Sequence, residues 1–252
     1  MALKFYDILK DIKLQYKPFG ECSILIEWPP IISDDILKSV LNYKKNIEKN
    51  KIKQKVYVIS AYNSLLVCYN IAINNFYYEI KLLKSLYYEN TCLKILKGKL
   101  WKIPVCYDIE FGIDLKQLSI EKNMLISEIL SYHTMSNYRV YFLGFLPGFL
   151  YLGGLHHNLH FPRKSTPKLR VKKGSVAIGA SQTGIYPNDS PGGWHIIGET
   201  PLNLFNIHNK LPCFAKPGDK IKFISITKNE FVIIQEQIRM NTYRLESEII
   251  YD

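Results

Sequence analysis

The sequence lacks the short motifs that mark the commonest nucleotide and hydrolase sites. It contains no GxxxxGK[ST] segment, no GxGxxG segment after an expected strand, and no GxSxG segment. These absences argue against a P-loop site, a Rossmann-type dinucleotide site and a typical α/β-hydrolase nucleophile. No CxxC pair occurs either, so we expect reduced thiols, no zinc site and no disulfide framework. The cysteines are Cys22, Cys68, Cys92, Cys106 and Cys213.

A secretory leader and a membrane-spanning run are also lacking. The segment 1–13, MALKFYDILKDIK, has no apolar core of signal-peptide length, and we therefore expect a cytoplasmic protein. The uncharged run 141–155, YFLGFLPGFLYLGGL, is shorter than the ~20 apolar residues of a spanning helix. Because it contains Pro147 and four glycines, it predicts a buried strand and then a glycine-lined loop where backbone approaches another group.

Arginine is scarce, although the chain is basic. The net charge of +11 includes 28 lysines and 5 arginines. The densest basic run, 44–55, has no arginine and no aromatic residue, whereas a nucleic-acid-binding surface combines both. We interpret this run as a solvated helix end and a surface strand, and we expect no nucleic-acid partner.

The first half of the chain alternates short strands with amphipathic helices. Strands are expected on both sides of the turn at 18–20 and of the turn at 61–64. One helix is expected to begin after the N-cap Ser33, and a second helix to cover 74–90. The order ββαββα predicts a small N-terminal α/β sandwich domain over 1–98.

The second half consists mainly of β-type runs separated by glycine, proline and asparagine. Their spacing predicts a closed or nearly closed β-barrel over 99–240, so the fold class is α+β. The runs are 139–145, 174–180, 192–199, 201–207 and 220–226. Ser119 is expected to cap a helix over 120–133, and Thr227 with Glu230 forms a capping-box pattern. Residues 241–252 are expected to form a loose tail.

The segment 179–198 combines tight-turn residues with large aromatic side chains. Its amide, hydroxyl and glycine backbone groups could line a ligand site, as in anion-binding nests. It could equally be a barrel-rim loop with tight turns in which Trp194 belongs to the core. The residues concerned are Gln182, Thr183, Tyr186, Gly192, Gly193 and Trp194.

Two further residues have both a functional and a structural interpretation. His133, at an expected helix C-terminus, is either a proton-exchanging group or a packed core histidine. Arg163 could hold a carboxylate or phosphate with two hydrogen bonds, or be an ordinary loop residue. The histidines of 156–160 have no acidic neighbour to complete a metal site, so no bound metal is expected. We assign no role to Asp108, Glu110 and Asp114.

Several motifs of the second half occur in an order typical of one family. They are IPVCY (103–107), His133, VYFLGFLPGFLYLGGL (140–155), Pro162-Arg163, GSVAIG (174–179), QTGIYP (182–187), SPGGW (190–194) and IIGETPLNLF (196–205). This set resembles the 5-oxoprolinase B-subunit family, which includes the sporulation-kinase inhibitor KipI and is also called allophanate hydrolase subunit 1. It is similar to carboxyltransferase subdomains C and D of urea carboxylase as well. The strong part covers about 101–227.

The resemblance implies a small α/β domain followed by a cyclophilin-like barrel. It also implies two partner subunits, a C-type (KipA-like) subunit and an A-type (LamB/YcsF-like) subunit. Such complexes convert 5-oxo-L-proline to L-glutamate with ATP, and Mg²⁺ enters with the ATP. The chain alone is then expected to be inactive. The alternative within the family is a non-catalytic KipI-like inhibitor of a sensor histidine kinase, and the barrel type alone would allow a prolyl isomerase.

The resemblance also suggests a site with two walls that meet at the barrel rim. One wall consists of Arg163, the 182–186 loop and the Gly192-Gly193 backbone, and the other is the run 141–155, in which Phe145 and Phe149 exclude water. Its expected catalytic residues are His133, Arg163, Gln182, Thr183 and Tyr186, and its expected ligand-binding residues are Gly144, Phe145, Pro147, Gly148, Gly192, Gly193 and Trp194. The sequence departs from the family pattern at Arg139, Lys168 and Ala180, where an acidic residue, an arginine and a glycine are usual. Lysine cannot form the two-pronged contact of arginine, which places an anion-binding role at 168 in doubt.

Overall fold

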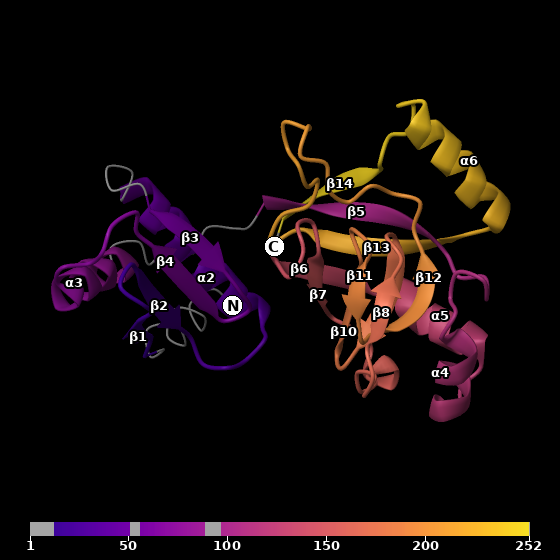
Figure 1. The fold of residues 1–252 in the computed structure, drawn as a ribbon, viewed down its shortest axis with the longest axis horizontal. Coiled ribbons are helices and arrows are strands. Elements are labelled where there is room, and N and C mark those ends of the chain that lie inside the picture. The colour runs from indigo at the N-terminus through magenta and orange to yellow at the C-terminus, as the bar shows by residue number, and fades with distance from the viewer. Residues whose placement is uncertain (1–12, 51–55, 89–96, 252) are drawn as a thin grey trace. The chain divides into compact units, whose positions relative to one another are not determined.

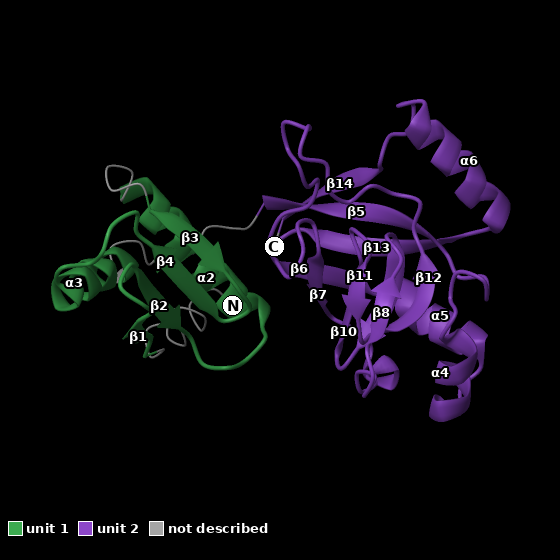
Figure 2. Ribbon diagram, in the orientation of Figure 1, with its two compact units in different colours: residues 1–96 green, residues 97–252 purple. Residues whose placement is uncertain are grey.

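The computed structural model describes residues 13–50, 56–88 and 97–251, which fall into two compact units. Unit 1 comprises Met1–Leu96 and unit 2 comprises Lys97–Asp252 (Figure 2). The division lies close to the sequence-based boundary at 98. Among the described residues, no helix combines the length and the apolar character needed to cross a bilayer.

Unit 1 is a four-stranded antiparallel sheet with two helices. The strands β1 (Gln15–Pro18), β2 (Ser23–Glu27), β3 (Tyr57–Ser60) and β4 (Ser64–Cys68) lie in the order β1-β2-β4-β3. The helices are α2 (Asp34–Asn50) and α3 (Phe76–Tyr88). Ser33 Oγ accepts the N–H of Ile36, which confirms the predicted N-cap and the ββαββα order.

The core of unit 1 forms because the strands alternate buried and partly exposed residues. Tyr43 on α2 is almost fully buried and packs edge-on against Trp28 and Tyr87. Its hydroxyl donates to the carbonyl of Leu83, so helix α2 and helix α3 are joined through one buried hydrogen bond of 2.6 Å.

Unit 2 is built around a closed barrel of mixed strands (Figure 1). Around the barrel the order is β12-β9-β10-β7-β6-β13-β5, and β12 pairs with β5 to close it. The bounds are β5 (Lys97–Cys106), β6 (Asn137–Leu143), β7 (Leu150–Gly153), β9 (Ser175–Gly179), β10 (Gln182–Ile185), β12 (His195–Glu199) and β13 (Lys220–Ile226). The α+β prediction and the barrel are confirmed. The expected run 201–207 is wrong as a strand, because only Phe205 forms a bridge, to Cys213.

A two-stranded ribbon lies outside this barrel. Its strands are β8 (Lys168–Val171) and β11 (Ser190–Gly192), which pair antiparallel. Val171 packs with Ala177 and Ile196 of the barrel strands in an outer cluster that is separate from the barrel interior. The barrel wall in this region is therefore buried on both faces.

The turn before β13 is fixed by Asp219. Gly218 has a φ of 93°, and Asp219 N–H donates to the carbonyl of Lys216, which is the pattern of a type II turn with Pro217-Gly218 at its centre. The buried Asp219 carboxylate accepts the indole N–H of Trp101 at 3.0 Å and two backbone N–H groups. Arg139 donates to the carbonyl of Gly218, so this departure from the family pattern serves a buried contact.

Three helices and one 3₁₀ turn accompany the described part of the barrel. They are α4 (Leu115–Lys122), α5 (Ile126–Met135), η2 (His157–Leu159) and α6 (Lys228–Arg239). The expected single helix capped by Ser119 is wrong: Ser119 lies inside α4, and Asn123 ends α4 with a φ of 49°. The capping box of Thr227 and Glu230 at the start of α6 is confirmed.

The expected loose tail is wrong for residues 247–251. Residues Ser247–Tyr251 form strand β14, which pairs antiparallel with β5 from Trp101 to Lys97. Lys102 of β5 forms ion pairs with Glu246 and Glu248 on either side of the start of this strand. Sequence alone misses β14 because its side chains are mostly exposed and its hydrogen-bonding partner is distant in the chain.

Candidate functional site

The two glycine-rich segments of the sequence meet on one side of the barrel. Strand β7 follows the 144–148 loop and pairs with β10 through Leu152 and Thr183. The ring of Phe149 lies 5.6 Å from the ring of Tyr186 and 5.6 Å from that of Trp194. The predicted meeting of these segments is confirmed.

Strand β10 divides the candidate residues between two faces of the barrel wall. Successive side chains of a strand point to opposite faces. Thr183 and Ile185 are fully buried, and Ile185 belongs to the barrel interior, whereas Tyr186 belongs to the outer cluster with Phe149 and Trp194. Gln182, at the start of the strand, is only partly buried.

His133 lies inside the barrel and has partners for both ring nitrogens. The Thr183 hydroxyl donates to the carbonyl of Ala177, so Thr183 Oγ1 accepts the Nε2–H of His133 at 2.9 Å. His133 Nδ1 then accepts the hydroxyl proton of Tyr107 at 2.8 Å. Burial lowers the pKa of His133 to about 3. The geometry therefore supports the interpretation of His133 as a packed core histidine. Thr183 belongs to the same buried series of hydrogen bonds.

The outer cluster depends on close backbone approach. A Cβ on Gly192 would lie 2.3 Å from the hydroxyl oxygen of Tyr186, and a Cβ on Gly179 would lie 2.5 Å from the Trp194 ring. Burial raises the pKa of Tyr186, although the backbone N–H of Trp194 and the charge of Arg163 oppose the shift. Gly179 thus lets the β9 backbone approach Trp194 closely, and Gly192 lets the β11 backbone approach Tyr186.

Arg163 stacks on this cluster from the exposed side. Its guanidinium carbon lies 5.5 Å from the centre of the Trp194 ring, within the range of a cation–π contact. Gly193, which precedes Trp194, accepts the backbone N–H of Lys164 at 2.8 Å. Arg163, Gly193 and Trp194 are therefore neighbours, as the two-wall hypothesis requires.

The 144–148 loop carries an exposed aromatic residue in a strained conformation. Phe145 has a φ of 65° and is 64% exposed, and its ring lies edge-on to Phe149 at 5.7 Å. Gly148 has a φ of 86°, and a Cβ there would lie 2.6 Å from Phe205. Pro147 is exposed and Gly144 is half-buried. The loop thus presents Phe145 beside the outer cluster.

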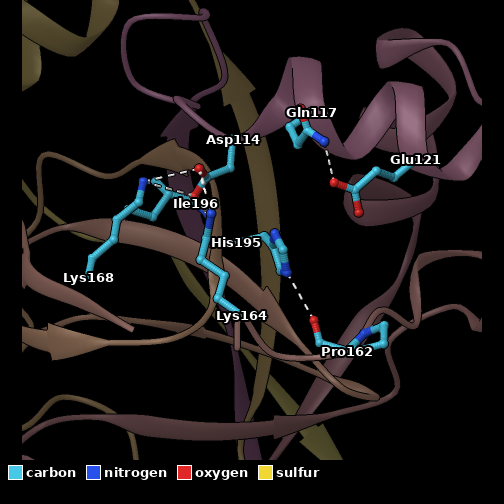
Figure 3. Close-up of polar contacts among 8 residues, drawn as sticks. All are labelled: Asp114, Gln117, Glu121, Pro162, Lys164, Lys168, His195 and Ile196. Atoms are coloured by element: carbon cyan, nitrogen blue, oxygen red, sulfur yellow. Dashed lines mark hydrogen bonds and ion pairs between the residues drawn. The ribbon is translucent and has the colours of Figure 1, made fainter. Parts of the chain in front are cut away.

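Sequence reasoning missed the charged centre next to this cluster. Asp114 is buried, and its Oδ1 accepts Lys164 Nζ at 2.9 Å and Lys168 Nζ at 3.0 Å (Figure 3). Its Oδ2 accepts the N–H of Ile196 at 2.8 Å. Burial opposes ionisation, but the Ile196 N–H and the two ammonium groups outweigh it and hold the pKa of Asp114 below its usual value.

His195 is a second residue that the sequence did not single out. It is 6% exposed, and its Nε2–H donates to the carbonyl of Pro162 at 2.9 Å (Figure 3). Its Nδ1 is buried without a hydrogen-bond partner among the described residues. No short pattern signals either residue, because their partners lie more than thirty positions away along the chain. In the part of the chain that the structure describes, no group of three or more His, Cys, Asp and Glu side chains could hold a metal ion.

A profile of the family described as "Carboxyltransferase domain, subdomain C and D" matches residues 14–215. A Bacillus subtilis (strain 168) protein named as the B subunit of 5-oxoprolinase is 31% identical over 240 residues, which cover 90% of this chain and 98% of that protein. The chain belongs to the 5-oxoprolinase B-subunit family. A Haemophilus influenzae protein of the same name is 35% identical over 209 residues, covering 82% of this chain and 95% of its own length.

Solved structures also resemble this member of the B-subunit family. TTHA0988 superposes with a TM-score of 0.71 at 28% identity and covers 81% of this chain. The chain spans only 39% of TTHA0988, so that protein carries additional sequence. Kluyveromyces lactis urea carboxylase, at 18% identity, shares the fold with a TM-score of 0.77 over 96% of this chain and 24% of its own.

Proposed function

We propose that this chain is the B subunit of an ATP-dependent 5-oxoprolinase, which converts 5-oxo-L-proline to L-glutamate. Membership of the 5-oxoprolinase B-subunit family supports the proposal. In it, a C-type (KipA-like) and an A-type (LamB/YcsF-like) subunit complete the enzyme. The chain alone does not turn over substrate.

The proposed reaction needs an activated lactam carbonyl. Transfer of the γ-phosphoryl group of ATP to the lactam oxygen gives ADP and a phosphorylated lactam. Water then attacks the same carbon, the ring C–N bond breaks and the nitrogen takes up a proton, which leaves γ-glutamyl phosphate. A second water hydrolyses this acyl phosphate to L-glutamate and inorganic phosphate. Negative charge on the transferring group calls for fixed cations and N–H donors. Mg²⁺ would enter with ATP and neutralise part of the phosphate charge.

The proposed wall of the site is the outer face of the barrel between the 144–148 loop and β11. One observation carries it: where the two glycine-rich segments meet, Arg163 lies over the Trp194 ring, and Phe149 contacts both Trp194 and Tyr186 edge-on, so the four side chains form one continuous cation–aromatic cluster. Aromatic side chains exclude water there, and the exposed guanidinium offers paired N–H donors to an anion. Phe145 would close over this surface when substrate or partner binds.

In this proposal the residues inside the barrel do not contact the ligand but position the residues that do. His133 and Thr183 hold β10 from inside the barrel, and Gln182 stands at the start of the same strand. His133 and Thr183 are positioning residues. Gln182 is the polar side chain of this strand that we propose contacts the ligand.

The test is reconstitution with purified A-type and C-type subunits. Glutamate formation and ADP release are measured with 5-oxo-L-proline and ATP, and each should require this chain. Arg163→Ala and Gln182→Ala should each lower kcat/KM at least tenfold. Arg170→Ala, which alters an exposed arginine paired with Asp189, is the matched control and should keep full activity.

Full activity in both Arg163→Ala and Gln182→Ala would refute the site. A different outcome would favour the KipI-like inhibitor as the function of this chain. In that case the assembled complex would form no glutamate, and this chain would bind tightly to a sensor histidine kinase.

A further inference from the structure

Two lysines share a single buried carboxylate at the edge of the outer cluster. Asp114 accepts both Lys164 and Lys168 through Oδ1, and its side chain is 10% exposed. An ammonium group has three N–H donors, and Asp114 is the acceptor that the described residues provide for both lysines. Each ammonium group therefore keeps N–H donors that no described protein group accepts.

The cluster also carries uncompensated positive charge. Two ammonium groups face one carboxylate, which leaves an excess of +1 at Asp114. Arg163, on the neighbouring Trp194 ring, adds a second positive charge. The lysine side chains are 21% and 32% exposed, so an ion from solvent can reach them while most of each side chain is shielded.

The backbone around these lysines is held in place before any ligand binds. Lys164 N–H donates to Gly193, and Lys168 pairs with Gly192 in the outer ribbon. His195 fixes the start of the same loop through Pro162, and the next residue, Ile196, donates to Asp114. A preorganised pair of ammonium groups loses little side-chain freedom when it binds an anion.

We propose that Lys164 and Lys168 form a binding site for a small oxyanion, either a carboxylate or a phosphate, with Asp114 as the residue that positions both ammonium groups. Asp114 keeps the two nitrogens close despite their mutual repulsion. The ligand would bridge the donors that Asp114 leaves unused. The inference deepens the proposed function and rests on it for the choice of ligands, since 5-oxo-L-proline carries a carboxylate and ATP carries phosphates.

The test uses the full chain without partner subunits, so that it does not depend on the enzymatic reaction. Inorganic phosphate, ATP, 5-oxo-L-proline and 2-pyrrolidone, which is the same lactam without the carboxylate, are titrated at constant ionic strength. Binding is measured by calorimetry and by the NMR shift of the Ile196 amide, which donates to Asp114. The variants are Lys164→Met, Lys168→Met, the double substitution and Lys168→Arg. Lys173→Met, at an exposed lysine, is the control.

Wild-type chain should bind 5-oxo-L-proline or the phosphate ligands, and 2-pyrrolidone at least tenfold more weakly. Each single methionine variant should lower the affinity for the anion at least tenfold, and the double variant should abolish binding. Lys168→Arg should retain binding. If the chain binds 5-oxo-L-proline more tightly, the oxyanion that the site takes is the substrate carboxylate. If it binds inorganic phosphate and ATP more tightly, the oxyanion is a phosphate.

Anion binding by the folded double variant at wild-type strength would overturn the proposal, as would absence of any anion binding by the wild type. Failure of the reconstituted complex to make glutamate would instead refute the proposed function alone. The anion site would then stand on the titrations of the isolated chain.

Discussion

The buried His133 should make the stability of unit 2 depend steeply on pH. In the folded barrel its pKa is about 3, because burial disfavours the charged ring, and both ring nitrogens already have hydrogen-bond partners. Protonating Nδ1 would turn this acceptor into a donor facing the Tyr107 hydroxyl. In the unfolded chain a histidine has a pKa of about 6.5. Between pH 6.5 and pH 3 the unfolded state therefore binds a proton at this histidine, whereas the folded state does not.

The magnitude follows from the difference between the two pKa values. Each pKa unit is worth about 1.36 kcal/mol, so the shift from about 6.5 to about 3 corresponds to roughly 5 kcal/mol in full. The stabilisation is complete above pH 6.5 and is lost as the pH falls towards 3. Between pH 7.5 and pH 5, His133 should account for a loss of about 2 kcal/mol in the free energy of unfolding.

The assay compares wild type with His133→Gln by urea denaturation at several values between pH 7.5 and pH 5. A Trp28→Phe background leaves tryptophan fluorescence to Trp101 and Trp194, which both belong to unit 2. The substitution will itself destabilise the barrel at every pH, so the quantity of interest is the slope. The stability difference between the two proteins should shrink by about 2 kcal/mol over this range.

His208→Gln is the control, because His208 is exposed and its removal should leave the slope unchanged. Parallel pH profiles for wild type and His133→Gln would refute the argument. That outcome would mean that the folded barrel admits the proton.

Three further substitutions test other features. Ala180 has a φ of 55°, so Ala180→Gly should raise stability by about 0.5–1 kcal/mol in thermal unfolding, and a fall in Tm would contradict this. Asp219→Ala removes the acceptor of Trp101 and of two backbone N–H groups and should cost about 2–4 kcal/mol in urea denaturation; a loss below about 1 kcal/mol would show that water replaces the carboxylate. Gly192→Ala forces a Cβ against Tyr186 and should cost about 1–3 kcal/mol and lower activity of the reconstituted complex, whereas unchanged activity would place the ligand away from the outer cluster.

Local patterns predicted much of the fold. The caps at Ser33 and Thr227 were correct because a capping side chain and its N–H partner lie three residues apart in the sequence. The helix expected from Ser119 was wrong because Asn123 adopts the left-handed conformation and divides it. Strand β14 was missed because no local pattern marks it, and because its pairing partner β5 lies about 150 residues earlier in the sequence.

The sequence predicted Arg163 and the aromatic and glycine parts of the candidate site, but not the charged centre at Asp114. Phe149, Tyr186 and Trp194 stand in motifs whose turn residues mark them, and they meet as expected. The alternation along β10 separates Thr183 from Tyr186, which could be foreseen only with the strand register known. Asp114 and Lys164 are fifty positions apart in the chain, so no short pattern could pair them.

The pairing of β5 bears on how the protein is made. This strand leads unit 2, yet its neighbours β12, β13 and β14 all come late in the chain. During synthesis on the ribosome, the backbone hydrogen-bonding groups of β5 stay unpaired until those segments emerge. Contacts of such long sequence separation form slowly. A nascent chain stalled before residue 247 would still expose the half of β5 that β14 covers, and would be a natural client for chaperones.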